Sequence, residues 1–566
     1  MEQAVECLRS TARCAYVQGQ NSMVDSLIEQ LYWMTPLAQK EPREGFVSAL
    51  AKSRQLQIVI NELFYIPREY GECLLAGWPL VLRCLAACER DELLPAEFFR
   101  QDALRYGSAE WLASDDTDDE HDEVQPTAID VPQPGLWKSM SETVLAYTGL
   151  AARAAVALGS PEVRPVALRC IAEAFPQEMI LRSSELSENS LLALVSSMVG
   201  EIRAVVTTEG PSATPVLVRS SSGSESNGAA PSGVEKLERL SDDDGAFYVD
   251  VLAEIAQRNE TRIACVWPTV SHHLLDVILK LAPCGSRILK HSLSAYLRVG
   301  ARQLFEHSSV KESLWVLFEG LADLPDDRLD PLLPILAVEL HEIVRLGFAG
   351  IATGQDTSSE SGPQVWRDIF RLMERTAALP AESRDAHQQR AAAHAFAALQ
   401  FVVLEVQHAV HDDVISSNSF SDCVSAVLAF AEPAVADTPA SAPAADGNAT
   451  RSRLGTTSSD LSTVGHRRSI QSLDLLFMLG TIEIGRGDER GAGVSIDKSL
   501  LHGLSVMSCD VREEVRSHAL SLLQTALGQH GLNEHVDLFR PLIDDHLAQA
   551  AAAAEAGRTD AHAGWV

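Results

Sequence analysis

Two histidines lie where a metal ion could bind. His408 and His411 are one helical turn apart and two aspartates follow them directly, so two imidazoles and a carboxylate could meet at one helix end, as ligands do in zinc sites. No distant cluster completes the four ligands that a structural zinc ion takes. We therefore favour a solvated helix end, and we predict no metal and no other cofactor.

Cysteine offers a second possible zinc motif. Cys84 and Cys88 are four residues apart in a helical pattern and could face the same way, but two thiols without a second pair make a poor zinc site. Small buried hydrophobic side chains are the better interpretation. The chain has ten cysteines at irregular spacing and no signal peptide at its start, which predicts free thiols in a reducing compartment.

The common catalytic motifs do not occur in the 566 residues. We find no G-x-x-x-x-G-K-S/T, G-x-G-x-x-G, G-x-S-x-G or H-E-x-x-H, so phosphate-binding loops, nucleophile elbows and zincin helices have no support. The acidic run at residues 115–123 lacks the spacing of a calcium-binding EF-hand loop. The sequence therefore predicts a chain that is not an enzyme by itself.

The composition indicates which elements must position any functional surface. Leucine and alanine are abundant and only 6% of residues are aromatic, which favours helices over strands. The formal net charge is −32, with the basic residues scattered, so nucleic acid is excluded as a partner. No stretch approaches 18 consecutive apolar residues, and we predict no transmembrane segment.

Apolar residues recur at helical spacing through most of the chain. In Gly245–Leu281 they fall mostly at steps of three and four, as in a pair of amphipathic helices, with the polar break at Asn259 and Thr261 as the expected cap. The irregular period of roughly 35–50 residues per pair suits HEAT-type units. We predict an all-α fold, a HEAT/armadillo-like α-solenoid of stacked helix pairs interrupted by disordered linkers. The same pattern predicts helix pairs at Leu56–Arg90, Gly135–Phe175, Ser286–Leu321, Leu332–Phe348, Ala386–Phe430 and Leu473–Leu527.

Breaks in this periodicity divide the chain into predicted domains and linkers. The linkers are recognised by acidic runs with proline, or by serine, glycine, alanine and proline. The predicted segments are a first helical region (1–112), an acidic linker (113–136), helical repeats (137–210), a Ser/Gly-rich linker (211–244), helical repeats (245–431), a disordered linker (432–469), C-terminal helical repeats (470–545) and an Ala-rich tail (546–566).

Three tryptophans open apolar helical runs. Trp78 and Trp267 are each followed by proline, which suits the first turn of a helix, and Trp366 precedes a third run. An exposed tryptophan would mark a binding hot spot. We favour a buried aromatic anchor between helix pairs instead.

One tryptophan lies in a block that resembles a known family. Residues 70–85 read Y-G-E-C-L-L-A-G-W-P-L-V-L-R-C-L, and L-L-P follows at 93–95. This resembles the Y-G-x-x-I/L-x-x-G-W-x-x-I/L-L-x-C-I/L block of the large ARF guanine-nucleotide exchange factors, in the first homology region downstream of their Sec-seven domain. The resemblance is strongest to the subgroup of the Golgi brefeldin-A-resistance factor and GNOM.

Further short blocks resemble the same downstream regions in the same order. They lie at Ala12–Ala15, Val24–Ile28, Asn259–Trp267, Pro283–Cys284, Gln364–Phe370, Val414–Phe430, Leu473–Leu476 and Asp510–Gln524. We expect the matched residues to have structural roles. They are Tyr70, Gly71, Gly77, Trp78, Leu82, Cys84, Leu94, Pro95, Arg262, Trp267, Pro283, Cys284, Trp366, Asp474, Asp510, Arg512, Arg516 and Gln524.

The resemblance implies a function without catalysis in this chain. The family's exchange glutamate lies in a Sec-seven loop resembling F-R-x-P-G-E-x-Q, and no such string occurs here. The chain would begin just downstream of that domain, as a truncated gene model or a separately encoded piece. The expected role is a regulatory or targeting α-solenoid of an ARF exchange factor in Golgi vesicle trafficking. The alternative is a stand-alone HEAT-type trafficking scaffold.

The resemblance also implies partners and a location. Expected partners are proteins, among them ARF- or Rab-type GTPases or a chain that carries a Sec-seven domain. The expected location is the cytoplasm, with peripheral contact at Golgi membranes. Because the chain is acidic outside its linker as well, protein partners, an amphipathic helix or a local basic patch such as His466–Arg468 would have to recruit it.

Overall fold

The computed structural model describes the chain in a series of helical ranges. These are residues 2–38, 45–95, 98, 163–208, 241–303, 307–353, 362–378, 386–408, 417–431, 467–479, 498–508, 510 and 512–530. Within them the regular structure is helical, and no strand occurs. The predicted all-α class is confirmed, and the packing of successive helices against each other fits an α-solenoid.

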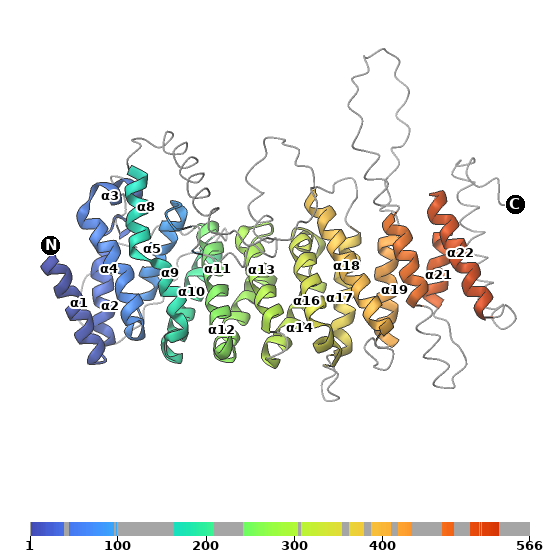
Figure 1. Cartoon of the computed structure of the whole chain (residues 1–566), viewed down its shortest axis with the longest axis horizontal. Coiled ribbons are helices and arrows are strands. Elements are labelled where there is room, and N and C mark those ends of the chain that lie inside the picture. Colours follow the sequence, from blue (N-terminus) through green and yellow to red (C-terminus); the bar gives the residue numbers. More distant parts are fainter. Residues whose placement is uncertain are drawn as a thin grey trace, which may run out of the picture. The chain divides into compact units, whose positions relative to one another are not determined.

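The chain divides into two compact units, Met1–Val299 and Gly300–Val566. In the first unit, helices that follow one another in the sequence mostly pack against each other (Figure 1). They are α1 (Glu2–Val17), α2 (Asn21–Trp33), α3 (Phe46–Lys52), α4 (Arg54–Tyr70), α5 (Trp78–Arg90), α8 (Val163–Ala174), α9 (Pro176–Leu181), α10 (Glu188–Thr208), α11 (Asp242–Arg258), α12 (Ile263–Asp276) and most of α13 (Arg287–Gln303), which crosses the boundary after Val299.

The second unit continues with helices of the same kind. Helix α16 packs on α18, and α17 packs on α14, α18 and α19. The bounds are α14 (Ser308–Ala322), α15 (Asp326–Leu329), α16 (Leu333–Thr353), α17 (Gly362–Ala377), α18 (Ala386–His408), α19 (Ser417–Ala431), a helical stretch at 467–479, α21 (Lys498–Met507) and α22 (Glu513–His530).

Local sequence explains where several helices begin. Helix α11 starts with a capping box, in which the Ser241 hydroxyl accepts from the Asp244 amide and the Asp244 carboxylate accepts from the Ser241 amide, satisfying free amides of the first turn. Ser53 caps α4 in the simpler way, accepting from Leu56 N at 3.2 Å. At Gly245 a Cβ would lie 2.6 Å from Ile288 Cδ1, so glycine lets α11 and α13 approach closely.

The predicted helix pairs agree with the structure at several places and fail at two. Leu473–Leu527 is not a pair, because it contains parts of three described helical stretches, 467–479, α21 and α22. Asn259 ends α11, at the break that the sequence indicated. Leu332–Phe348 is not a pair, because α16 runs without a break from Leu333 to Thr353. Its one proline, Pro334, lies in the first turn, where proline is tolerated, and the helix continues through Gly347. Trp267 lies in the second turn of α12 and Pro268 inside that helix, rather than in the first turn.

Most of the predicted linkers lie outside the described residues. This holds for 113–136, for 546–566 and for nearly all of 211–244 and 432–469. The helices after the last two linkers begin slightly earlier than predicted, at Asp242 and at residue 467. The remaining boundaries stay predictions.

Helix α10 is long and apolar. By length and composition, Glu188–Thr207 could cross a membrane, and no other described helix passes that test. Half of this stretch is buried in the structure, against α5, α11 and α12. The core helix of a folded domain meets the same criterion, and its buried face accounts for the composition.

Candidate functional site

The block around Trp78 forms a tight turn between α4 and α5. Trp78 opens α5 and its side chain is 1% exposed. A Cβ at Gly71 would lie 3.1 Å from Leu186 Cδ2, so this glycine admits a side chain from the segment before α10. The motif residues Leu82 and Cys84 are buried in α5, whereas Leu94 and Pro95 are half-buried after it.

Gly77 is held against α2 by an aspartate of another family-like block. The Asp25 carboxylate Oδ1 accepts from the backbone amides of Leu75, at 3.0 Å, and Gly77, at 2.8 Å. A Cβ at Gly77 would lie 2.6 Å from Leu74 Cδ1 and 3.2 Å from that oxygen. The two blocks therefore meet in space, and only glycine fits at this position without a shift of the turn.

Glu72 fixes the same turn to the start of α10. Its carboxylate lies 2.7 Å from Ser187 Oγ and 2.9 Å from Ser190 Oγ, and it accepts from the Ser187 amide. Burial alone would raise the pKa of Glu72, but the serine hydrogen bonds and the charge of Arg262 lower it below its usual 4.5. The carboxylate is therefore held in its charged form.

Arg262 reaches the same segment from the turn between α11 and α12. Its guanidinium donates to the carbonyls of Ser183, at 3.1 Å, Ser184, at 3.0 Å, and Leu186. It also donates to Asn259 Oδ1, while Asn259 Nδ2 donates to Ser183 Oγ at 3.2 Å. A guanidinium has five N–H donors in a rigid plane, so it can donate to several acceptors at once.

We call Gly71–Cys73, Ser183–Ser190 and Asn259–Arg262 together the motif junction. It joins two sequence blocks that are almost 190 residues apart through a third segment that no motif marked. The local sequence gives only a weak signal for that segment. Ser187 lies three residues before Ser190 at the start of a helical pattern, a position that suits an N-cap.

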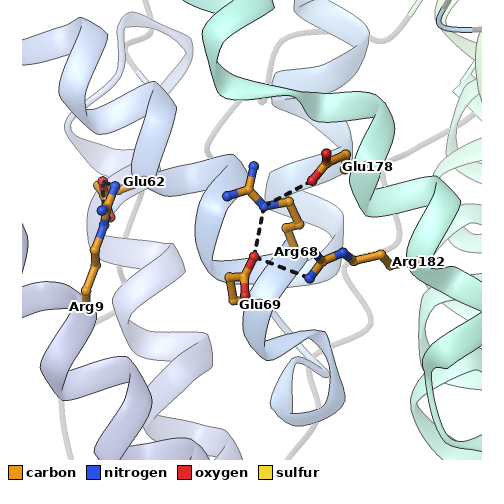
Figure 2. Close-up of polar contacts among 6 residues, drawn as sticks. All are labelled: Arg9, Glu62, Arg68, Glu69, Glu178 and Arg182. Carbon is orange, nitrogen blue, oxygen red and sulfur yellow. Dashed lines mark hydrogen bonds and ion pairs between the residues drawn. The ribbon is translucent and has the colours of Figure 1, made fainter.

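Charged pairs next to the motif junction connect α4 to its neighbours (Figure 2). Arg68 Nε lies 3.1 Å from Glu69 Oε1 and 3.6 Å from Glu178 Oε2, and Arg182 Nη1 lies 3.3 Å from the same Glu69 oxygen. On the other side, Arg9 of α1 makes a two-pronged contact at 2.6–3.1 Å with Glu62. The Glu62 side chain is 2% exposed, whereas the Arg9 side chain is 44% exposed, so only the carboxylate of this pair is shielded from solvent.

In the second unit, Arg512 makes several hydrogen bonds to other segments, as Arg262 does in the first unit. Its guanidinium donates to both carboxylate oxygens of Asp510, to Ser469 Oγ at 2.8 Å and to the Ala431 carbonyl at 3.1 Å. Arg516 donates to the Asp510 carbonyl at 2.9 Å. These contacts tie the end of α19 to the starts of the 467–479 helix and α22, as Arg262 does in the first unit.

The other motif residues separate into aromatic anchors and exposed positions. Trp267 and Trp366 are buried, their rings contacting Tyr296 at 5.0 Å and Phe370 at 5.7 Å between centroids. The interpretation of all three tryptophans as buried is thus confirmed. The remaining residues are Tyr70, half-buried against Tyr16 and Tyr65, Asp474, exposed but 2.7 Å from His518 Nε2, and Pro283, Cys284 and Gln524, which are exposed.

The candidate metal ligands are not brought together in the described ranges. Cys84 and Cys88 are fully buried, as the hydrophobic interpretation predicted. His411 lies outside the described residues, and the side chain of His408 is not described either. No group of three or more His, Cys, Asp or Glu side chains in the described residues could hold a metal ion.

Thiol labelling should separate the cysteines into two classes. Cys7, Cys14 and Cys284 are exposed, whereas burial raises the pKa of Cys170 to about 11 and that of Cys423 further. A buried, protonated thiol reacts slowly. Brief alkylation of the native protein at pH 7.5, followed by peptide mass spectrometry, should modify the first three and leave the last two for labelling after unfolding. Rapid modification of Cys423 would contradict its buried position.

Comparison with known proteins confirms the resemblance to large ARF exchange factors. ARF guanine-nucleotide exchange factor GNL1 of Arabidopsis thaliana is 22% identical over 552 residues, covering 93% of this chain and 32% of the relative. ARF guanine-nucleotide exchange factor GNOM of the same plant is 23% identical over 542 residues, covering 89% and 30%. No family model matches the chain.

A relative from an animal matches a shorter stretch. The Golgi-specific brefeldin A-resistance guanine nucleotide exchange factor 1 homolog of Caenorhabditis elegans is 23% identical over 352 residues, which cover 60% of this chain and 15% of that protein. The chain thus spans about a third, or less, of the length of the curated relatives it matches.

Proposed function

We propose, from its similarity to large ARF guanine-nucleotide exchange factors over most of its length, that the chain is a non-catalytic regulatory or targeting α-solenoid of such a factor in Golgi vesicle trafficking. The observation that carries the proposal is the 93% of the chain that aligns with only 32% of one relative. The positions of the matched motifs agree with it. Most of them are buried anchors or structural fasteners, and none presents a catalytic group.

The fasteners suggest how such a solenoid would work. The motif junction holds three helix turns of the first unit in fixed relation, through Glu72, Ser187 and Arg262. A surface built from several stacked helices is then preformed for a partner, which lowers the entropic cost of binding. With a net charge of −32, the chain would repel an anionic membrane, so we propose that protein partners bring it to the Golgi.

An exchange assay tests the absence of catalysis. Purified chain at micromolar concentration should release fluorescent GDP from an ARF GTPase no faster than the spontaneous rate, because it has no exchange glutamate. The positive control is a Sec-seven domain in the same assay, which must accelerate release. Acceleration by the chain alone would refute the non-catalytic role.

The regulatory role needs a second arm of the same experiment. Adding the chain in excess to the Sec-seven domain should change the exchange rate or retain that domain in a pull-down, since a regulatory region contacts what it regulates. The matched control is the Arg262→Ala variant, in which the motif junction is weakened. If the intact chain neither changes the exchange rate of the Sec-seven domain nor retains that domain in the pull-down, the regulatory role is excluded. The targeting role is then tested by whether the tagged chain localises to the Golgi.

A further inference from the structure

Two histidine rings meet where α16 packs on α18. The ring centroids of His341 and His394 are 5.7 Å apart, and the ring planes meet edge to face at 65°. Both side chains are half-buried, and His341 Nδ1 is buried with no hydrogen-bond partner among the described residues. We call these two residues the histidine pair. Edge-to-face packing suits neutral aromatic rings.

A proton added to either ring would disturb this arrangement. In a protonated imidazole both nitrogens carry a hydrogen, so His341 Nδ1 would present a buried N–H with no acceptor, which costs free energy. Protonation of both rings would place two positive charges on rings whose centroids are 5.7 Å apart, and like charges at such a distance repel. The contact therefore favours neutral rings.

The electrostatic surroundings of the pair act in the same direction. Burial is the largest cause that lowers the pKa of both histidines from the ordinary 6.5. Arg345 lowers the pKa of His341 further, and Arg390 and His341 lower that of His394. Glu342 opposes both shifts without reversing them, and its Oε2 already lies 2.8 Å from Arg345 Nη2.

Other titratable groups on the surrounding helices do not act on the pair. Of the described charged side chains on α16, α17, α18 and α19, those that shift the pKa of either ring are Glu342, Arg345 and Arg390, besides the rings themselves. The other titratable side chains described on these helices are Glu339, Arg367, Asp368, Arg371, Glu374, Arg375, Glu405, Asp422 and Cys423. The side chains of His387 and His408, at the two ends of α18, are not described.

We propose that the histidine pair makes the α16–α18 contact sensitive to acid: the two helices stay packed while both rings are neutral and separate more readily when the rings are protonated. Separation brings the rings into water, where a charged imidazole is solvated and its N–H groups find acceptors. The two helices have 21 and 23 residues, so acid would loosen a large part of the second unit.

The direction of the pH effect follows from linkage. In the separated or unfolded state the rings have the ordinary pKa of 6.5, and in the packed state both pKa values are lower. Between these values the separated state binds protons that the packed state does not. Stability is therefore highest above about pH 6.5 and falls as the pH drops below it. The fall ends where the packed rings take up protons as well.

Amide hydrogen exchange of the full chain tests the proposal. Between pH 7.5 and pH 5.5 the protection factors of the α16 and α18 amides should fall about tenfold. The bound is roughly hundredfold, for two rings that both stay neutral one pH unit below 6.5. Protection factors already divide out the intrinsic pH dependence of exchange. Combining His341→Gln with His394→Gln removes both titrating rings and should reduce the fall to less than about twofold.

A matched variant and a second measurement complete the test. The His272 side chain is 83% exposed on α12, so His272→Gln should keep the wild-type fall in α16 and α18. Exchange of the imidazole C2 hydrogens, followed by peptide mass spectrometry, needs no variant and should give pKa values below 6.5 for both rings. The proposal is overturned if wild-type protection in α16 and α18 does not change over this range. It is equally overturned if the double variant keeps the full fall, or if both rings titrate at pH 6.5 or above.

Discussion

Trp78→Ala should destabilise the first unit by about 3–5 kcal/mol, the largest effect that we expect from a single substitution. The side chain is almost completely buried at the start of α5, where it packs beneath the Gly71 turn. Removing the indole leaves a cavity between α5 and the segment before α10, which the close-packed helices cannot fill. Urea unfolding followed by circular dichroism at 222 nm measures the loss.

Matched variants separate packing from the loss of any tryptophan. Trp33 is 56% exposed at the end of α2, so Trp33→Ala should cost less than about 0.5 kcal/mol. Trp78→Phe should cost about 1–2 kcal/mol, because Trp78 Nε1 makes no hydrogen bond within the described residues and only volume is lost. Labelling of Cys84, which is buried in the first unit, reports the transition of that unit specifically. An equal cost for the two alanine variants would contradict the buried anchor.

Arg262→Ala should weaken the motif junction by about 2–3 kcal/mol. The substitution removes charge-assisted hydrogen bonds to the Ser183, Ser184 and Leu186 carbonyls, although water can replace some of them at this partly exposed position. Arg262→Lys should restore less than half of the loss, since one ammonium cannot reproduce the fork of donors. The same urea titration measures both variants.

The control and the coupling test use neighbouring residues. The Arg169 side chain is 73% exposed and lies 3.9 Å from Glu173, so Arg169→Ala should change stability by less than about 0.5 kcal/mol. Glu72→Gln combined with Arg262→Ala should cost less than the sum of the single changes, because both side chains hold the segment Ser183–Ser190. Strict additivity would show that the two motif blocks are not coupled through this segment.

Sequence patterns anticipated the helices better than their ends and contacts. The pair α11–α12 with its break at Asn259 follows from periodicity and capping, which are local. The prediction divided α16 because polar residues such as Glu339 and His341 interrupt its apolar sequence and resemble a turn between two helices. In the folded chain Glu339 is buried within one continuous helix. Tertiary packing decides such cases, and one sequence does not contain it.

The motif residues could be named from the sequence, but their purpose could not. Glu72 and Ser187 are 115 residues apart, and nothing local marks them as partners. Long-range contact and burial are properties of the fold, so they appear only once the helices are placed.

The arginine contacts to main-chain carbonyls have a consequence for tolerance of extreme solution conditions. Arg262, Arg375 and Arg512 all donate to backbone oxygens of a preceding helix turn. A peptide carbonyl does not titrate, so these hydrogen bonds do not depend on a carboxylate, unlike the contacts of Arg375 with Asp326 and of Arg512 with Asp510. Acid should therefore break the carboxylate ion pairs first, while the arginine–carbonyl hydrogen bonds at these three places persist.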